Sequence, residues 1–303
     1  MSLTFPTTAL KKPSGLTAPL PSKFKRPAFG SLYGFDAQGG AAASFVNEKS
    51  VLFDGTDDMA DSGATFNSIW SGSFSISLWY KSPSTFAAGV DNFLGNKYAA
   101  GKGNIEFRMR QQTSSTASIE LYFSPEAGTI QLYAGLTNTG ANYLSANTWY
   151  HLCWVADRPA SGTTSSLLYM NGTSRTLVHT GGASTIQNAG GTFDNNTLIG
   201  ARNTATSGSG SGQLFLDGHL DEMAFFNSTL TADDVDSIYN GGVPNDLSVA
   251  SSYDTDRTSD LVHWWRFGDG TEAGAGDVIH DMAGSTNLTT STDPATYSTD
   301  VPS

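Results

Sequence analysis

Apolar and polar residues alternate in several short segments between residues 50 and 242. In residues 74–80 and 105–110 every second side chain is apolar, which is the period of a strand with one buried face. Other segments rich in apolar and aromatic residues are also expected to be strands; they are residues 51–53, 119–123, 130–133, 150–155, 167–170, 197–200, 220–226 and 261–267. Roughly a dozen short strands at close spacing predict an all-β sandwich or barrel.

Two local signals interrupt the strand pattern. Asn171 and Gly172 both tolerate positive φ, so they predict a tight hairpin between two strands. One short helix is predicted over residues 231–239, where Thr231 can act as the cap and two aspartates fall in the first turn. Gly241 is a natural stop for this helix. We expect the helix to cover one end of the sandwich.

The two ends of the chain do not follow the strand pattern. Residues 1–45 are rich in Pro and show neither the helical nor the strand period of apolar residues, and the basic residues of this segment are Lys11, Lys12, Lys23, Lys25 and Arg26. The segment is either a disordered tail or an extended basic arm that becomes ordered on a partner, and its regularly spaced apolar residues favour the arm. We therefore expect an arm over 1–45, a sandwich over 46–284 and an irregular tail over 285–303.

Composition narrows the classes of function. The chain has 303 residues, of which 33 are Gly and 15% are charged, and its formal net charge of −12 disfavours nucleic acid as a partner. No apolar run approaches the ~18 residues of a membrane span. The first residues lack the pattern of a secretion signal, so we expect neither membrane insertion nor signal-dependent export. The one cysteine, Cys153, is expected to be a buried, inert thiol.

Five short motifs occur in a fixed order along the chain. They are the strand and turn at 51–59, the strand at 74–80, the segment 147–152 leading to 168–172, the segment 198–200 leading to 218–222, and the helix start at 230–235. Over about residues 50–242 they resemble the laminin-G-like branch of the concanavalin A-like lectin/glucanase superfamily. The resemblance implies an all-β jelly-roll sandwich with one short capping helix, preceded here by the extended N-terminal arm.

A narrower resemblance lies nearer the C-terminus. Residues 239–247, 264–269, 281–284 and 300–302 are similar to segments of structural proteins of marine phages and large viruses. In many of those relatives the Trp-Arg-Phe segment precedes the sandwich, whereas here it follows. We expect it to complete the same sheet from the other end. This resemblance implies a location on a virion rather than a particular activity.

Catalysis is not expected from the arrangement of acidic residues. Hydrolysis of a glycosidic bond needs two carboxylates at a defined separation. The glucanases of this superfamily carry a Glu-x-Asp-x-Glu strand, which this sequence lacks. Glu106 and Glu120 each stand alone in their strands, and the adjacent Asp221 and Glu222 are expected to point to opposite faces.

The aspartates near residue 54 and at 221 have two interpretations, a calcium site or caps of local structure. Ca²⁺ takes several oxygen ligands from flexible loops, and Asp54, Asp57 and Asp58 lie in one turn. The resemblance implies one structural calcium near the edge at which Asp221 lies, so Asp54, Asp57 and Asp221 are the predicted ligands. In the alternative, Asp54 and Asp57 cap the turn through backbone hydrogen bonds and Asp221 holds the start of the helix.

Glycan binding would use exposed aromatic rings beside polar partners. Trp70, Tyr98 and Tyr143 fall in predicted loops and are the candidates for stacking on a sugar. The tryptophans on predicted strands are expected in the core; they are Trp79, Trp149, Trp154 and Trp264.

The sequence therefore predicts a non-enzymatic virion structural protein, either a capsid decoration protein or a fibre or attachment protein. The arm would bind other virion proteins, and the sandwich would face outward and bind host-surface glycans. A homo-oligomer such as a trimer suits both roles, although no heptad segment supports it. One alternative is a free or cell-surface carbohydrate-binding module, and another is a glucanase-like hydrolase.

Overall fold

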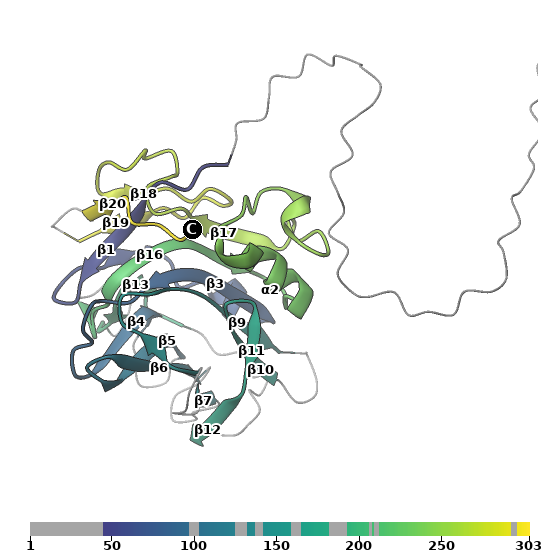
Figure 1. Cartoon of the computed structure of the whole chain (residues 1–303). Helices are drawn as coiled ribbons and strands as arrows, with labels where there is room; N and C mark the ends of the chain where they lie inside the picture. The colour runs from purple at the N-terminus through teal and green to yellow at the C-terminus, as the bar shows by residue number, and fades with distance from the viewer. Residues whose placement is uncertain are drawn as a thin grey trace, which may run out of the picture. The chain divides into compact units, whose positions relative to one another are not determined.

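The fold is a sandwich of two antiparallel β-sheets (Figure 1). The computed structural model describes residues 45–96, 103–124, 132–136, 142–158, 165–181, 193–205, 208, 212–291 and 296–303. The prediction of an all-β sandwich is confirmed. Most of the predicted N-terminal arm lies outside the described residues, including the basic side chains Lys11, Lys12, Lys23, Lys25 and Arg26.

One sheet has eight strands. Seven of them lie in the order β11 (Thr173–Arg175), β10 (Ser165–Met170), β9 (Trp149–Asp157), β3 (Phe74–Lys81), β16 (Asp217–Phe226), β1 (Ser50–Asp54) and β20 (Thr296–Ser298). The eighth, β17 (Leu261–Trp265), pairs with residues 223–226 of β16, next to the part of β16 that pairs with β1. The predicted strand at 261–267 is therefore confirmed as part of this sheet.

The other sheet has ten strands. Nine lie in the order β12 (Leu177–Gly181), β7 (Leu132–Leu136), β6 (Thr116–Ser124), β5 (Asn104–Thr113), β4 (Val90–Gly95), β13 (Leu198–Ile199), β2 (Ala60–Asp61), β19 (Leu288–Thr290) and β18 (Val278–Ile279). The tenth, β8 (Leu144–Ser145), pairs with β6. A separate ribbon of β14 (Arg202–Asn203) and β15 (Gly212–Gln213) lies against β4.

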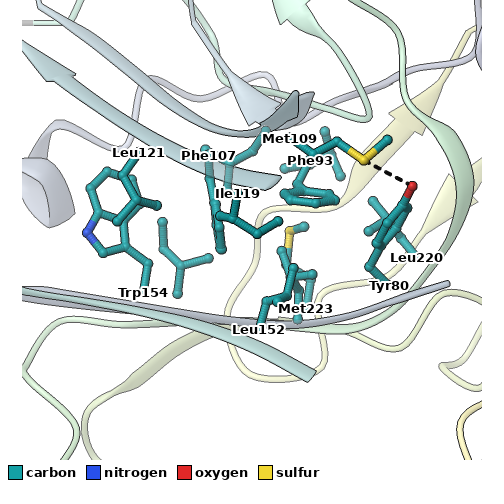
Figure 2. Packing of buried hydrophobic residues seen from close by; sticks show 14 of the residues in the cluster. Tyr80, Phe93, Phe107, Met109, Ile119, Leu121, Leu152, Trp154, Leu220 and Met223 are labelled. Carbon is teal, nitrogen blue, oxygen red and sulfur yellow. Dashed lines mark hydrogen bonds between the residues drawn. The ribbon is translucent and has the colours of Figure 1, made fainter. Parts of the chain in front are cut away.

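The main core lies between the two sheets (Figure 2). In β3, Phe74, Ile76, Leu78 and Tyr80 are buried in this core, as the alternation in the sequence predicts. The Tyr80 hydroxyl donates a hydrogen bond to the Asp217 carbonyl at 2.8 Å, so the one polar group of this row has a partner.

The predicted hairpin and helix are both present. Asn171 and Gly172 have φ values of 52° and 72° and connect β10 to β11. The helix α2 (Ala232–Tyr239) begins with a capping box, in which the Thr231 hydroxyl accepts from the Asp234 N–H and the Asp234 carboxylate accepts from the Thr231 N–H. Each half of the box satisfies a backbone donor that the first turn of a helix leaves free.

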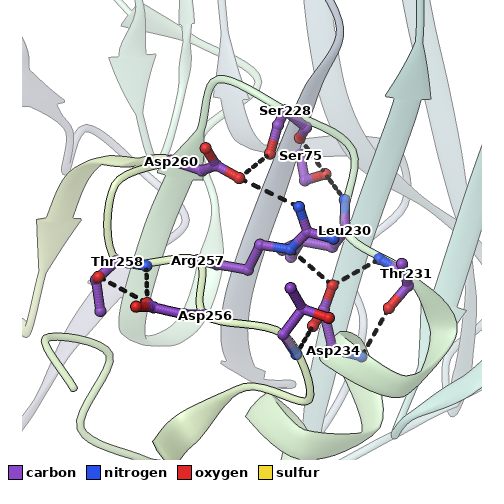
Figure 3. Close-up of polar contacts among 10 residues, drawn as sticks. Ser75, Ser228, Leu230, Thr231, Asp234, Asp256, Arg257, Thr258 and Asp260 are labelled. Carbon is purple, nitrogen blue, oxygen red and sulfur yellow. Dashed lines mark hydrogen bonds and ion pairs between the residues drawn. The ribbon is translucent and has the colours of Figure 1, made fainter. Parts of the chain in front are cut away.

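Asp234 also ties α2 to a later part of the chain (Figure 3). Its carboxylate accepts from the Thr255 N–H at 3.0 Å and from Arg257 Nε at 2.9 Å, and the Arg257 Nη1 donates to Asp260 at 3.3 Å. These bonds lower the pKa of Asp234 against the opposing effect of burial. The capping residue therefore joins the helix to the segment that leads into β17.

A second, smaller core lies under α2 on the outer face of the eight-stranded sheet. It contains Val235 and Ile238 of the helix together with Cys153, Tyr169 and other residues of the sheet. Cys153 is fully buried, and burial raises the pKa of its thiol. The prediction of a buried thiol is confirmed.

The C-terminal segment differs from its prediction. Residues 285–303 were expected to form an irregular tail, but they contribute β19 and β20. In β20, Tyr297 lies opposite Val51 of β1, and β19 pairs with both β2 and β18. The Ser- and Thr-rich composition hides these strands because each is only three residues long.

A four-residue helix, α1 (Asn67–Trp70), was not predicted. It is too short to show the apolar spacing of a helix, and it places Ile69 and Trp70 in the core. Among the described residues no helix combines the length and apolar character needed to cross a membrane.

Candidate functional site

Charged and aromatic side chains gather on the outer face of the ten-stranded sheet. In β5, Ile105 and Phe107 are buried in the main core, so alternation places Glu106, Arg108 and Arg110 on the outer side. Residues of β6, β7 and β14 join them there. We call this surface the arginine face, and it consists of Glu106, Arg108, Arg110, Glu120, Tyr122, Tyr133 and Arg202.

Arg108 bridges the two carboxylates of the arginine face. Its Nη1 donates to Glu106 Oε2 at 2.8 Å, and its Nε donates to Glu120 Oε2 at 3.0 Å. Glu120 of β6 lies directly opposite Arg108 of β5. Glu106 is two residues before Arg108 on β5, so it lies diagonally across from Glu120. The sequence-based view that Glu106 and Glu120 stand alone is therefore wrong, because pairing of β5 with β6 brings them to one guanidinium.

The charges of this group are fixed by their mutual contacts. Glu106 is 2% exposed and Arg108 has an 11% exposed side chain. Burial disfavours the charge of Arg108, but the carboxylates of Glu106 and Glu120 outweigh burial and raise the pKa of the guanidinium. In the described structure both carboxylates act as hydrogen-bond acceptors for Arg108.

The rings of Tyr122 and Tyr133 lie beside the bridging arginine. The Arg108 guanidinium is 5.9 Å from the Tyr122 ring centroid and 5.5 Å from that of Tyr133. The Tyr133 hydroxyl donates to Glu120 Oε1 at 3.2 Å, which also accepts from Arg110 Nε at 2.6 Å. Aromatic rings held among charged groups offer the combination of flat surface and polar contacts that sugars require.

Arg202 reaches the same face from the ribbon that lies against β4. Its Nη1 is 3.6 Å from Glu106 Oε1, and its Nη2 donates to Gln213 at 3.2 Å. Asn92 of β4 lies opposite Arg108 and is fully buried, yet neither the oxygen nor the nitrogen of its amide has a hydrogen-bond partner. Buried amides without partners are rare, so this end of the face is not complete in itself.

Of the three predicted glycan-binding residues, the structure describes Trp70 and Tyr143. Trp70 is fully buried and packs edge-on against Phe66 and Phe74, so its prediction as an exposed loop residue is wrong: the loop folds into α1 and turns the ring inward. Tyr143 is half-buried beside β8. Tyr98 lies outside the described residues.

The tryptophans predicted to be in the core are mostly there. Trp79, Trp154 and Trp264 are 3% exposed or less. Trp149 is only half-buried, and its Nε1 donates to Asp300 at 2.9 Å. None of these rings belongs to the arginine face.

The predicted calcium ligands do not converge. Asp54 lies opposite Asp217 where β1 meets β16, so Asp221 is four residues farther along β16, about 13 Å away at the rise of a strand. The carboxylate oxygens of Asp54, Asp57 and Asp58 do lie within 4.8 Å of one another. The prediction that Asp54, Asp57 and Asp221 form one site is therefore wrong.

The acidic turn is held by its own backbone. Asp54 Oδ1 accepts from the Thr56 N–H at 2.7 Å and from the Asp57 N–H at 3.4 Å, and Asp58 Oδ2 accepts from the Asp54 N–H at 3.0 Å. These are the hydrogen bonds of an Asx turn. For Asp54 the structure supports the alternative that the carboxylate caps the turn.

Asp221 offers a different environment. It is fully buried on the outer face of β16, where Asn47 Nδ2 donates to its Oδ2 at 3.1 Å. Its Oδ1 and the side-chain oxygen of Asn47 are buried without partners. Burial, followed by the charge of Glu222, raises the pKa of Asp221 well above its usual range. Two unpartnered hard oxygens in one buried place are suited to a cation.

Glu222 lies on the same side of the sheet as Asp221, so the prediction that the two acids point to opposite faces is wrong. The residue has φ 46°, and the register between β16 and β3 shifts between Asp221 and Ala224. This bulge interrupts the alternation. Glu222 accepts from Trp264 Nε1 at 2.6 Å and Arg266 Nε at 2.9 Å, while burial raises its pKa to about 7.

Residues 45–49 lie on the outer face of the eight-stranded sheet. The Phe45 ring stacks on Trp264 with centroids 6.4 Å apart, and the Arg266 guanidinium lies 4.3 Å from the Phe45 centroid. The Asp269 carboxylate accepts from the backbone N–H groups of Glu48 and Lys49 at 2.7 and 2.9 Å. The described chain therefore begins on the face opposite to the arginine face.

Sequence reasoning missed the arginine face because its members come from four separate strands. A partial signal was nevertheless present: the outward positions of 105–110 are Glu106, Arg108 and Arg110, and opposite charges on one face of a strand pair can interact. Pairing of β5 with β6 could not be deduced from either strand alone.

The sequence matches one family model. It is described as the concanavalin A-like lectin/glucanases superfamily, and it covers residues 54–236. No protein of curated function matches the sequence.

Several solved structures are similar to this one. A proposed carbohydrate-binding protein from Bacteroides ovatus is 18% identical with a TM-score of 0.53; the match covers 85% of this chain and 62% of that protein. A SAP-like pentraxin from Limulus polyphemus is 15% identical with a TM-score of 0.43, over 65% and 84% of the two chains. Tailspike protein 2 of an Escherichia coli O157:H7 bacteriophage is 14% identical with a TM-score of 0.46, over 72% and 26%. At 18% identity the likeness to the Bacteroides protein shows the fold alone, and the chain spans less than two thirds of that protein.

Proposed function

Because the chain belongs to the concanavalin A-like lectin/glucanase superfamily, we propose that it binds carbohydrate through the arginine face and does not cleave it. The observation that carries this proposal is the arrangement around Arg108, where two carboxylates and two tyrosine rings are held together on an outer sheet face. Fixed polar groups beside flat rings can orient sugar hydroxyls at little entropic cost.

The absence of catalysis is part of the proposal. Glycoside hydrolysis needs two carboxyl groups that reach the scissile bond, whereas Glu106 and Glu120 are both engaged by hydrogen bonds from Arg108. Burial raises the pKa of Asp221 and of Glu222, but both residues are buried on the opposite face. A reducing-sugar assay on a polysaccharide panel should give no turnover, and any turnover lost in Glu120→Gln would revive the hydrolase alternative.

Glycan binding can be tested with the full chain on a glycan array. We expect at least one glycan to be bound, and Tyr122→Ala to weaken that binding about tenfold because a stacking ring is removed. Arg175→Gln on β11 of the other sheet is the control and should bind like the wild type. An array without signal, or unchanged binding by Tyr122→Ala, would contradict the proposal.

We further propose that the module is carried on a virus particle, as a decoration protein or a fibre, with residues 1–45 as its attachment. The support is the resemblance of residues 239–247 and 264–269 to viral structural proteins, together with the position of residues 45–49 on the face opposite to the arginine face. In a symmetric particle, many copies would turn weak glycan contacts into useful avidity.

Particle composition tests this second proposal. Peptide mass spectrometry of density-purified particles should recover the protein in stoichiometric amounts, and deletion of residues 1–45 should abolish its incorporation. If the protein is absent from particles, the free or cell-surface carbohydrate-binding module becomes the better account.

We propose that a structural calcium ion is bound by Asp221 and Asn47, and not by the turn that contains Asp54. The support is the pair of buried oxygens without partners, one from each residue. Calcium supplies charge that would offset the buried Asp221 carboxylate.

Thermal unfolding with and without Ca²⁺ tests this assignment. Calcium should raise the Tm of the wild type and of Asp57→Asn, because ligands that bind only the folded state stabilise it. It should leave the Tm of Asp221→Asn unchanged. An equal rise in Asp221→Asn, or no calcium found by elemental analysis of the calcium-loaded wild type, would sink the assignment.

A further inference from the structure

Most of the acceptor capacity of the two carboxylates of the arginine face is already used within the protein. Glu106 accepts from Asn104 Nδ2 at 3.1 Å and from Arg108 at 2.8 Å, and Arg202 Nη1 lies 3.6 Å from it. Glu120 accepts from Arg108, from Arg110 and from the Tyr133 hydroxyl. About one of the roughly four lone-pair sites of each carboxylate is left for a sugar hydroxyl.

Donors, in contrast, are left over. A guanidinium offers about five N–H donors, and Arg202 uses its two terminal nitrogens on Gln213 and Glu106 while its Nε is buried without a partner. Next to it, the amide of Asn92 is fully buried and also has no partner. The two residues meet above Gly95, where a Cβ atom would lie 3.2 Å from Asn92 Oδ1 and 3.4 Å from Arg202 Cα.

The formal charge of the arginine face also favours an anionic ligand. The arginine face holds three arginines and two glutamates, so it is positive by one charge in a chain whose formal net charge is −12. A positive surface on an acidic protein selects locally for anions, because charges act over about a Debye length of 8–10 Å.

We propose that the glycan bound by the arginine face is acidic, and that its carboxylate or sulfate group lies against Arg202. This inference rests on the proposed glycan-binding function and narrows it to one class of ligand. Arg202 has a 27% exposed side chain, so an anion can reach its guanidinium and accept two parallel hydrogen bonds. A neutral glycan offers the exposed part of the guanidinium only uncharged acceptors, which form weaker hydrogen bonds than a carboxylate or sulfate does.

A glycan array of matched pairs tests the ligand class. Each pair consists of an acidic glycan and the neutral glycan that lacks only its acidic group, and both carboxylated and sulfated glycans are included. We expect the bound glycans to be acidic members, with each neutral partner bound at least about tenfold more weakly, as for loss of a charge-assisted hydrogen bond. Signals on carboxylated or on sulfated glycans alone would identify which anion is recognised.

Two variants locate the contact. Arg202→Gln keeps an amide donor and removes the charge, and it should lower the affinity for the acidic glycan about tenfold, so that the acidic glycan loses most of its advantage over the neutral partner. Arg175→Gln removes the same charge from β11 and should match the wild type. A circular dichroism spectrum and Tm equal to those of the wild type show that each variant is folded.

The outcomes separate this inference from the proposal on which it rests. Binding of neutral members as strongly as their acidic partners would overturn the inference and leave glycan binding in place, as would acidic-glycan binding unaffected by Arg202→Gln. No binding to any glycan would overturn both.

Discussion

Single residues decide which side chains meet in this protein. Arg108 joins Glu106 to Glu120 across two strands, and the left-handed conformation of Glu222 puts two buried acids on one side of β16. Neither effect changes the fold, yet each creates a polar cluster where strand alternation alone would leave separate charges. The following two predictions belong to this scale.

Removal of the Arg108 side chain should lower the free energy of unfolding. Arg108→Met would leave Glu106, which is 2% exposed, without its main counter-charge, and loss of one partner of a buried ion pair costs about 3 kcal/mol or more. Urea unfolding of the two proteins measures the difference. Arg110→Gln is the control; its side chain is 42% exposed, so its loss should cost less than about 1 kcal/mol. Equal losses in the two variants would show that the bridge contributes no more to stability than a surface pair.

Asp91 should make stability fall as pH rises. Burial, followed by the charge of Asp217, raises the pKa of its carboxyl from 3.8 to about 7. The folded state therefore holds this proton more firmly than the unfolded state, so the stabilisation is complete below about pH 4 and is lost as the pH rises to about 7. Asp91→Asn, which stays neutral, should gain stability relative to the wild type as the pH rises, and its advantage at pH 8 should exceed that at pH 4.5 by about 3 kcal/mol.

Urea unfolding at these two pH values checks the Asp91 prediction. Asp254→Asn changes an exposed aspartate and serves as the control for the lost charge. Glu222 has a raised pKa in the same range but titrates in both proteins, so its contribution cancels. A stability difference between Asp91→Asn and the wild type that is the same at pH 4.5 and pH 8 would rule out the role of Asp91.

At the scale of elements, the parts that local sequence specifies are those that could be predicted. Thr231 and the acidic residues of the first turn predicted α2, and Asn171 with Gly172 predicted the turn between β10 and β11. The three-residue strands β19 and β20 were missed because their partners, not their sequence, make them strands. The helix α1 was missed for the same reason, and with it the burial of Trp70.

The cap of α2 shows how far such local prediction reaches. Thr231→Ala should cost about 1 kcal/mol, the usual value for loss of an N-cap. Asp234→Ala should cost about 3 kcal/mol, because it also leaves Arg257 and the Thr255 N–H without their partner. Chemical denaturation measures both values. Equal costs would mean that the bonds to Arg257 and Thr255, which the sequence near the helix does not reveal, add nothing.

At the scale of the whole molecule, the two sheets carry different outer faces. The eight-stranded sheet is covered by α2 and by residues 45–49, whereas the ten-stranded sheet carries the arginine face. The fold could be predicted because strand period and motif order are properties of one chain segment at a time. The binding surface could not, because Arg202, Arg108 and Glu120 come from three strands that are adjacent only after folding.

The account places a glycan on the outer face of β5, β6 and β7, and a crystal structure of the protein with the best-bound glycan of the array tests this most directly. We predict electron density for the sugar over Tyr122 and Arg108, with its acidic group against Arg202. Density for the sugar at any other surface, such as the turn at Asp54 or the loop that carries Tyr143, would contradict the account.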